Sequence, residues 1–133
     1  MNIQNATVFI VDDDLSVLKG LDRLFRSVGY EVETFDEGSQ VIEAVENAEK
    51  VGEAFHIIFL DLINRKGLGG KETLRKLTQL VPHAKIVAIS GFSDGSERDT
   101  LKKLGFSEVL FKPFKLDDLK KIIEQISKAG GHH

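Results

Sequence analysis

The chain contains the stretch Ile57-Ile58-Phe59-Leu60-Asp61, followed by the glycine-rich segment Leu62-Ile63-Asn64-Arg65-Lys66-Gly67-Leu68-Gly69-Gly70. Consecutive apolar residues bounded by turn-forming residues are typical of a fully buried strand. A carboxylate at the end of such a strand lies at the rim of a sheet, where open α/β folds bind their ligands. Asp61 is therefore the first candidate for a functional residue.

Four other segments have the pattern of strands. Three are apolar throughout, as in buried strands, and one alternates polar with apolar residues, which predicts an edge strand. The apolar segments are Val8–Val11, Ile86–Ile89 and Val109–Phe111, and the alternating one is Glu31–Phe35. Helical spacing marks a helix after each strand, through Leu18–Val28, Val41–Ala48, Leu74–Val81, Leu101–Leu104 and Leu116–Ile126. Such alternation predicts an α/β fold with a parallel sheet covered on both faces.

Two helix starts carry capping signals. Asp14 precedes the first helical pattern and is its predicted N-cap, while Gly29 is its predicted stop. Asp94 and Glu97 have the spacing of a capping box, which predicts Asp94 as the N-cap of the fourth helix.

The composition is that of one ordinary globular domain. The 133 residues are 41% hydrophobic and 29% charged, and their net charge of −3 argues against a nucleic-acid-binding surface. The chain has no cysteine, which excludes disulfides, cysteine-ligated zinc and thiol catalysis. No apolar run has the length of a membrane span, and the N-terminus has no secretory signal pattern. Residues 130–133 are typical of the start of a purification tag, so we expect the domain to cover residues 1–129.

Polar residues stand where the predicted buried strands end. They are Asp12, Asp13, Asp61, Ser90 and Lys112. Because the carboxyl ends of parallel strands lie on one side of a sheet, we expect these side chains to converge. Three converging carboxylates are tolerable when they hold a cation, and hard oxygen ligands select Mg²⁺ or Mn²⁺. A hydroxyl, a lysine and a divalent ion around one aspartate are what aspartyl phosphorylation requires.

In these segments the chain resembles the receiver domains of two-component response regulators, including the chemotaxis-regulator-like receivers. The resemblance covers residues 5–128 and is carried by Val8–Asp14, Ile57–Asp61, Val87–Gly91 and Phe111–Phe114. It implies a flavodoxin-like, doubly wound sheet of five parallel strands in the order 2-1-3-4-5, with five helices. The edge-like pattern of Glu31–Phe35 agrees with that order.

The resemblance implies a metal site around the central aspartate. Asp61 would be the phosphoacceptor, and Asp12 and Asp13 would bind Mg²⁺ directly or through water. The backbone carbonyl of Ile63 would complete the protein ligands. Mg²⁺ is the implied cofactor, with Mn²⁺ as an alternative.

The resemblance also implies how the phosphoryl group is held. Ser90 would bond it and move on activation, and Lys112 would contact one of its oxygens. The Lys112–Pro113 peptide bond is expected to be cis, which is energetically cheap only before proline.

The implied function is that of a phosphorylation-controlled switch. The partners would be a sensor histidine kinase or phosphotransfer protein and a downstream effector domain or protein. The domain would catalyse its own phosphorylation and dephosphorylation without being an enzyme for a diffusible substrate. It would act in the cytoplasm, without binding nucleic acid or a membrane directly.

The sequence departs from the family pattern in two places. The loop Leu62–Gly70 lacks the usual Met-Pro pair, and Val109 stands where the family usually has an aromatic residue. We expect Phe111, the nearby aromatic residue, to face the other side of its strand. Ile63 and Phe92 flank the expected phosphoryl site, and we expect them to slow its hydrolysis by water.

Two other functions stay open at this point. A phosphorylation-independent pseudo-receiver would act only as a protein-binding module, and Val109 and the altered loop are compatible with it. A small flavodoxin-like or phosphatase-type enzyme is the second. A phosphatase would need a second acid two residues after Asp61, where this chain has Ile63. A flavin phosphate would be repelled by Asp12, Asp13 and Asp14.

Overall fold

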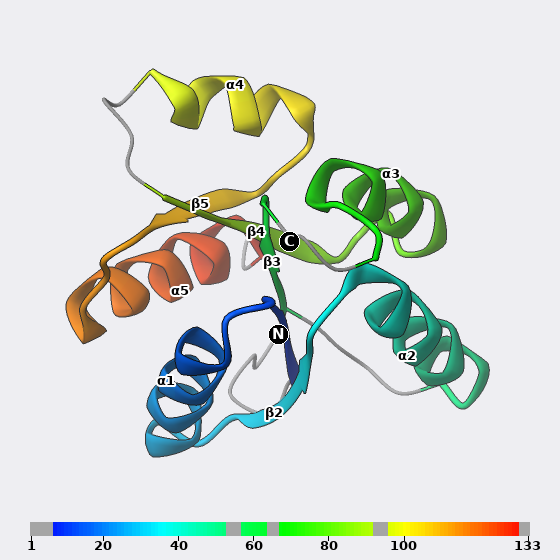
Figure 1. Ribbon diagram of the computed structural model, residues 1–133, viewed down its shortest axis with the longest axis horizontal. Coiled ribbons are helices and arrows are strands. Elements are labelled where there is room, and N and C mark those ends of the chain that lie inside the picture. Colours follow the sequence, from blue (N-terminus) through cyan, green and yellow to red (C-terminus); the bar gives the residue numbers. More distant parts are fainter. Residues whose placement is uncertain (1–6, 53–56, 64–66, 92–95, 131–133) are drawn as a thin grey trace.

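The structure of the chain, a computed structural model, describes residues 7–52, 57–63, 67–91 and 96–130. In these ranges strands and helices alternate, as the sequence predicts (Figure 1). The strands are β1 (Thr7–Val11), β2 (Glu31–Phe35), β3 (Ile57–Asp61), β4 (Lys85–Ser90) and β5 (Glu108–Phe111). The helices are α1 (Leu15–Ser27), α2 (Gly38–Lys50), α3 (Gly70–Leu80), α4 (Glu97–Leu104) and α5 (Leu116–Gly130).

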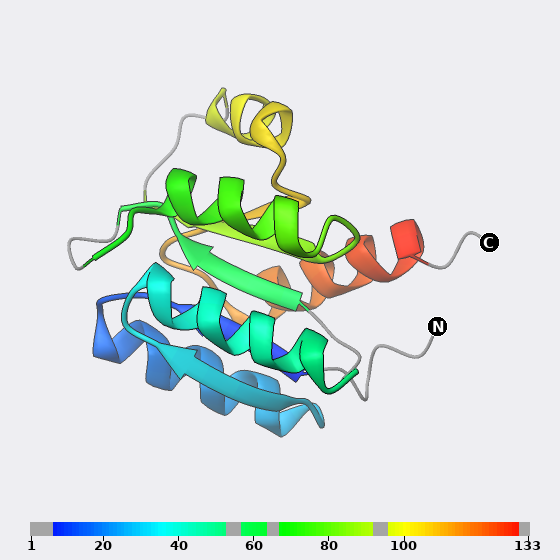
Figure 2. The ribbon, with the colours of Figure 1, turned by 90° about the vertical axis from the view of Figure 1, so that its right-hand side faces the viewer.

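The five strands found in the described ranges form one parallel sheet in the order β2-β1-β3-β4-β5. The predicted fold class and strand order are therefore confirmed, with β2 at an edge. Parallel pairing brings the carboxyl ends of the strands to the same end of the molecule. Figure 2 shows the arrows of β2 and β3 pointing the same way.

Each face of the sheet carries its own apolar core. On β3, Ile57 and Phe59 pack with residues of α1 and α5, whereas Ile58 and Leu60 pack with residues of α2, α3 and α4. Figure 1 shows the same division, with α1 and α5 on one side of the sheet and α2 and α3 on the other. All four side chains are at most 2% exposed, and burying each stabilises the fold by about 1.5–3 kcal/mol. This burial on both faces explains why the strand has no polar residue before Asp61.

The ends of α1 agree with the predicted signals, and the start of α4 does not. The Asp14 carboxylate caps α1 by accepting the Ser16 N–H at 2.9 Å, and Gly29 takes a positive φ of 97° just after it. The predicted capping box of Asp94 and Glu97 is wrong, because α4 begins at Glu97 with Ser96 as its N-cap. Asp94 itself lies outside the described residues.

The apolar stripe of α5 faces the core for most of its length. The pattern through Leu116, Leu119, Ile123 and Ile126 predicts a face that is mostly core with an exposed part. Leu119 and Ile126 are buried and Leu116 is 36% exposed, while Ile122, which the stripe omits, is buried as well. Among the helices that the structure describes, none is both long enough and apolar enough to cross a membrane.

Candidate functional site

Backbone hydrogen bonds extend past the strand ends and align the residues at the rim of the sheet. The N–H of Asp12 donates to the Phe35 carbonyl at 3.1 Å, and the N–H of Lys112 donates to the Ser90 carbonyl at 2.8 Å. Asp61, the last residue of β3, pairs with Ile89 of β4. Asp12, Asp61 and Lys112 are therefore placed by backbone pairing that continues from the apolar strands.

The structure brings the three predicted acids together. Ligand oxygens of Asp12, Asp13 and Asp61 all lie within 4.8 Å of one another. Asp12 is fully buried, Asp61 is only 5% exposed, and Asp13 is half-buried. Carboxylates this close repel one another when all are ionised.

Lys112 forms an ion pair with one of the three clustered acids. The Lys112 ammonium lies 3.2 Å from Oδ2 of Asp12, and Oδ1 of Asp12 accepts the Asp14 N–H at 2.9 Å. Oδ2 is buried and accepts no hydrogen bond of good geometry, and its ion-pair partner is Lys112. The Lys112 ammonium thus offsets part of the negative charge of the cluster.

The environment of Asp61 disfavours its charged form. Burial and the negative charges of Asp12 and Asp13 raise the pKa of Asp61 to about 7, against the lowering effects of Lys112 and of the Ile63 N–H. That N–H donates to Oδ1 of Asp61 at 3.3 Å. A divalent cation favours deprotonated carboxylates, so this donor set fits a hard metal ion such as Mg²⁺.

A cleft of about 260 Å³ opens over these residues. It is lined by Asp13, Asp14, Asp61, Ile63, Ile89, Ser90, Gly91 and Lys112. The side chain of Ile63 is 71% exposed at its mouth. The predicted neighbour Phe92 and the loop residues Asn64, Arg65 and Lys66 lie outside the described residues.

Helix α3, which follows the glycine-rich loop, begins in close contact with the end of β3. A Cβ atom on Gly70 would lie 2.6 Å from the carbonyl oxygen of Asp61 and 2.8 Å from Cα of Leu62. Both are backbone atoms, so only glycine fits here. The last glycine of the segment thus sets how closely α3 approaches Asp61.

Ser90 lines the cleft, but its hydroxyl donates a hydrogen bond to a residue of α4. Its Oγ donates to Oε1 of Glu97 at 2.8 Å, and Ser90 is only 7% exposed. The sequence predicts a capping role for Glu97 and does not link it to the site. No local pattern signals this contact, because it joins the end of β4 to the start of α4.

Val109 and Phe111 lie on the same face of β5. Val109 is buried with Leu101 of α4, and Phe111 packs against the same core. The expectation that Phe111 faces the other side is wrong, because residues two apart on a strand share a face. The Lys112–Pro113 peptide bond is cis, as expected.

Comparison with known proteins places this arrangement in a family. The family model of the response regulator receiver domain matches residues 8–124. The response regulator protein TmoT of Ectopseudomonas mendocina is 32% identical over 119 residues, which are 90% of this chain and 51% of TmoT. The DNA-binding transcriptional regulator NtrC of Escherichia coli is 28% identical over 123 residues, which are 92% of this chain and 25% of NtrC. The chain thus spans about half the length of TmoT and a quarter of that of NtrC.

A solved structure gives the same result for the fold. A chain of the CheX–CheY–BeF3–Mg²⁺ complex from Borrelia burgdorferi matches with a TM-score of 0.77 and 21% identity, over 93% of this chain and 88% of that chain. The strand order, the residues at the rim and the family match all agree. The chain belongs to the response regulator receiver domains of two-component systems.

Proposed function

We propose that Asp61 accepts a phosphoryl group from the phosphohistidine of a sensor kinase or phosphotransfer protein. The observation that carries this proposal is the convergence of a buried Asp61 with two further acids in an open cleft lined by Ser90 and Lys112. In the transfer, an oxygen of Asp61 forms the new bond to phosphorus, and the phosphorus–nitrogen bond of the donor breaks. The departing imidazole keeps the electron pair of that bond.

The acids of the cluster are suited to hold Mg²⁺, with Mn²⁺ as the alternative. Asp12, Asp13 and Asp61 would supply carboxylate oxygens, and the Ile63 carbonyl is the proposed fourth protein ligand. When bound, the ion neutralises negative charge on the transferring phosphoryl group. Oδ2 of Asp12 supports this assignment, because it is a buried acceptor that takes no hydrogen bond and is paired only by charge with Lys112.

The cationic and hydroxyl side chains act on the phosphoryl oxygens. Lys112 is 30% exposed, so its ammonium can turn from Asp12 toward a phosphoryl group on Asp61. The Ser90 hydroxyl lies in the same cleft and is the proposed second donor. The exposed Ile63 side chain at the cleft mouth would hinder the approach of water and prolong the phosphorylated state.

The added charge would then alter a surface read by a partner. The relatives support an effector as that partner, since the chain covers only part of TmoT and of NtrC, which is named a DNA-binding transcriptional regulator. We propose that this domain itself binds protein rather than nucleic acid, that it works in the cytoplasm, and that the only reactions it catalyses are its own phosphorylation and dephosphorylation.

The test uses acetyl phosphate as donor and intact-protein mass as the measurement. We expect the wild-type chain with Mg²⁺ to gain the mass of one phosphoryl group, and Asp61→Asn to gain none. Mn²⁺ in place of Mg²⁺ tests the alternative ion. A folded wild-type chain that takes up no phosphoryl group with either ion would overturn the proposal in favour of the pseudo-receiver.

A further inference from the structure

Helix α4 is held to the rest of the protein mainly by polar contacts. The helix has eight residues, and within Glu97–Leu104, which the structure describes in full, Leu101 alone is buried. Arg98 and Lys102 reach from the helix to the Glu108 carboxylate on β5. A helix with so little buried apolar surface can be repositioned by changing a few polar contacts.

The polar contact at the first turn of α4 involves the proposed phosphoryl site. Glu97 is the first residue of the helix, and its carboxylate accepts the Ser90 hydroxyl at 2.8 Å. Ser90 in turn lines the cleft that contains Asp61 and Lys112. One hydrogen bond therefore connects the cleft to the start of the helix.

A serine hydroxyl has a single hydrogen to donate. While it donates to Glu97, it cannot donate to an oxygen bound at Asp61. A phosphoryl group there would be a second anionic acceptor for the same hydrogen. Its charge would also repel the Glu97 carboxylate across Ser90.

We propose that Glu97 is a positioning residue that holds the Ser90 hydroxyl in the unphosphorylated protein and so opposes the switched state. The inference rests on the proposed function of Asp61. Phosphorylation draws Ser90 toward the phosphoryl group, the bond to Glu97 breaks, and the first turn of α4 is released. The helix then remains attached by Leu101 and by the contacts of Arg98 and Lys102 with Glu108.

Loss of this bond makes the switched state easier to reach. The probe is BeF3⁻ with Mg²⁺, the pair present in the Borrelia burgdorferi CheY complex, titrated into the protein and followed by amide NMR signals. Glu97→Ala is expected to lower the apparent Kd by roughly threefold to tenfold, the effect of one hydrogen bond of ordinary net strength. Glu97→Gln keeps a hydrogen-bond acceptor without the charge, so it should lower the Kd by less than Glu97→Ala does. The same variant tests the inference if Glu97→Ala fails to fold.

A double-mutant comparison separates this role from a general effect on the helix. In a Ser90→Ala background, Glu97→Ala should lower the Kd by much less than it does in the wild type, because the hydroxyl that Glu97 holds is gone and only the charge repulsion is relieved. Asp99→Ala removes another acid from the same turn and should leave the Kd unchanged.

The outcomes distinguish the two proposals. If the wild-type chain binds BeF3⁻ with Mg²⁺ and Glu97→Ala binds it equally well, or if Glu97→Ala acts equally without Ser90, this inference fails and the proposed function stands. If the wild-type chain neither binds BeF3⁻ with Mg²⁺ nor takes phosphate from acetyl phosphate, the proposed function fails and the inference with it.

Discussion

At the scale of single residues, Asp61 is costly to the folded protein when it is ionised. Its pKa is raised from an ordinary 3.8 to about 7, first by burial and then by the charge of Asp12. The folded state therefore binds a proton more tightly than the unfolded state does. The contribution of Asp61 to the free energy of unfolding is then most favourable at acidic pH and falls as the pH rises from about 4 to about 7.

Asp61→Asn should remove this penalty in metal-free protein. We expect the variant to exceed the wild type in free energy of unfolding by on the order of 2–4 kcal/mol above about pH 7, since one pKa unit corresponds to about 1.4 kcal/mol. The difference should vanish below about pH 3, where the wild-type carboxyl is protonated in both states. Urea unfolding across this pH range measures it, and two parallel pH profiles would contradict the assignment.

The glycines of the loop after Asp61 offer a matched pair. Gly70→Ala places a methyl group against the backbone of Asp61 and Leu62, and should destabilise the fold by about 1–3 kcal/mol or displace the end of β3. Gly69→Ala meets nothing within 4 Å and has a negative φ of −70°, so it should cost little. Urea midpoints of the two variants provide the test, and equal effects would refute the close approach of α3.

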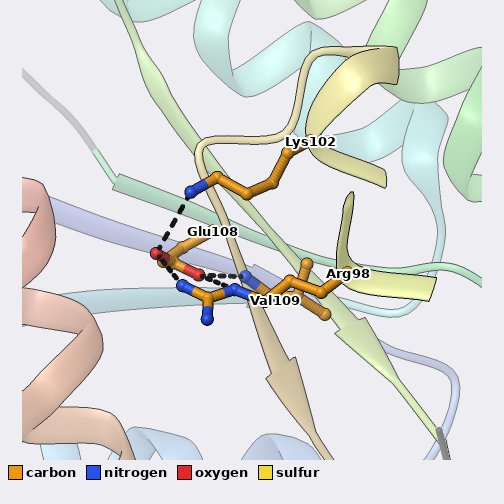
Figure 3. A network of polar contacts seen from close by, with 4 residues as sticks. All are labelled: Arg98, Lys102, Glu108 and Val109. Atoms are coloured by element: carbon orange, nitrogen blue, oxygen red, sulfur yellow. Dashed lines mark hydrogen bonds and ion pairs between the residues drawn. The ribbon is translucent and has the colours of Figure 1, made fainter. Parts of the chain in front are cut away.

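At the scale of elements, Glu108 ties α4 to the sheet. Figure 3 shows its carboxylate beside Arg98, Lys102 and the Val109 N–H. Arg98 donates two hydrogen bonds, at 3.1 and 2.7 Å, and the Lys102 ammonium lies 3.6 Å away. Burial opposes ionisation of Glu108, but the bonds from Arg98 and Val109 and the nearby positive charges outweigh it and lower its pKa.

Glu108→Gln should therefore weaken the attachment of α4. We expect a loss of about 1–2 kcal/mol in free energy of unfolding, because the variant loses its charge interactions with Arg98 and Lys102. The loss stays moderate because these two side chains are half-exposed and can be hydrated instead. Since the folded pKa is depressed, the contribution is full above the ordinary glutamate range and is lost as the pH falls through the folded value. Urea unfolding and hydrogen exchange of the α4 amides measure the effect.

A surface pair provides the control for this network. Glu72 pairs with Arg75 on the outside of α3, and Glu72→Gln should change stability little because such exposed pairs contribute little. Equal losses in the two variants would show that the burial of Glu108 has no special consequence.

At the scale of the whole molecule, metal binding and folding are linked. A ligand that binds only the folded state raises the free energy of unfolding by about 1.4 kcal/mol at a concentration near tenfold its Kd. We expect Mg²⁺ to raise the melting temperature of the wild-type chain and to have no such effect on Asp13→Asn. Asp14→Asn is the matched control, because asparagine keeps the cap of α1 and the residue is not one of the three clustered acids. A Mg²⁺ response that survives in Asp13→Asn would exclude this residue as a ligand.

Local patterns in the sequence determined the elements and the edge at which the polar residues gather. Periodicity depends on neighbours along the chain, so the strand Ile57–Asp61 and the edge character of Glu31–Phe35 could be read directly. The convergence of Asp12, Asp61 and Lys112 followed because parallel strands end on one side of a sheet. The strand order came from resemblance to a family, since periodicity alone does not order strands.

Only the tertiary structure decided the contacts between elements. The bond from Ser90 to Glu97, the buried ion pair of Glu108 and the close approach of Gly70 to β3 join segments whose relative placement no local pattern encodes. The sequence signal at Glu97 was even misleading, because an acid at a helix start serves equally as a cap or as a partner for a distant hydroxyl. Which role it takes depends on the side chains that packing places within hydrogen-bond reach, and packing is a property of the whole fold.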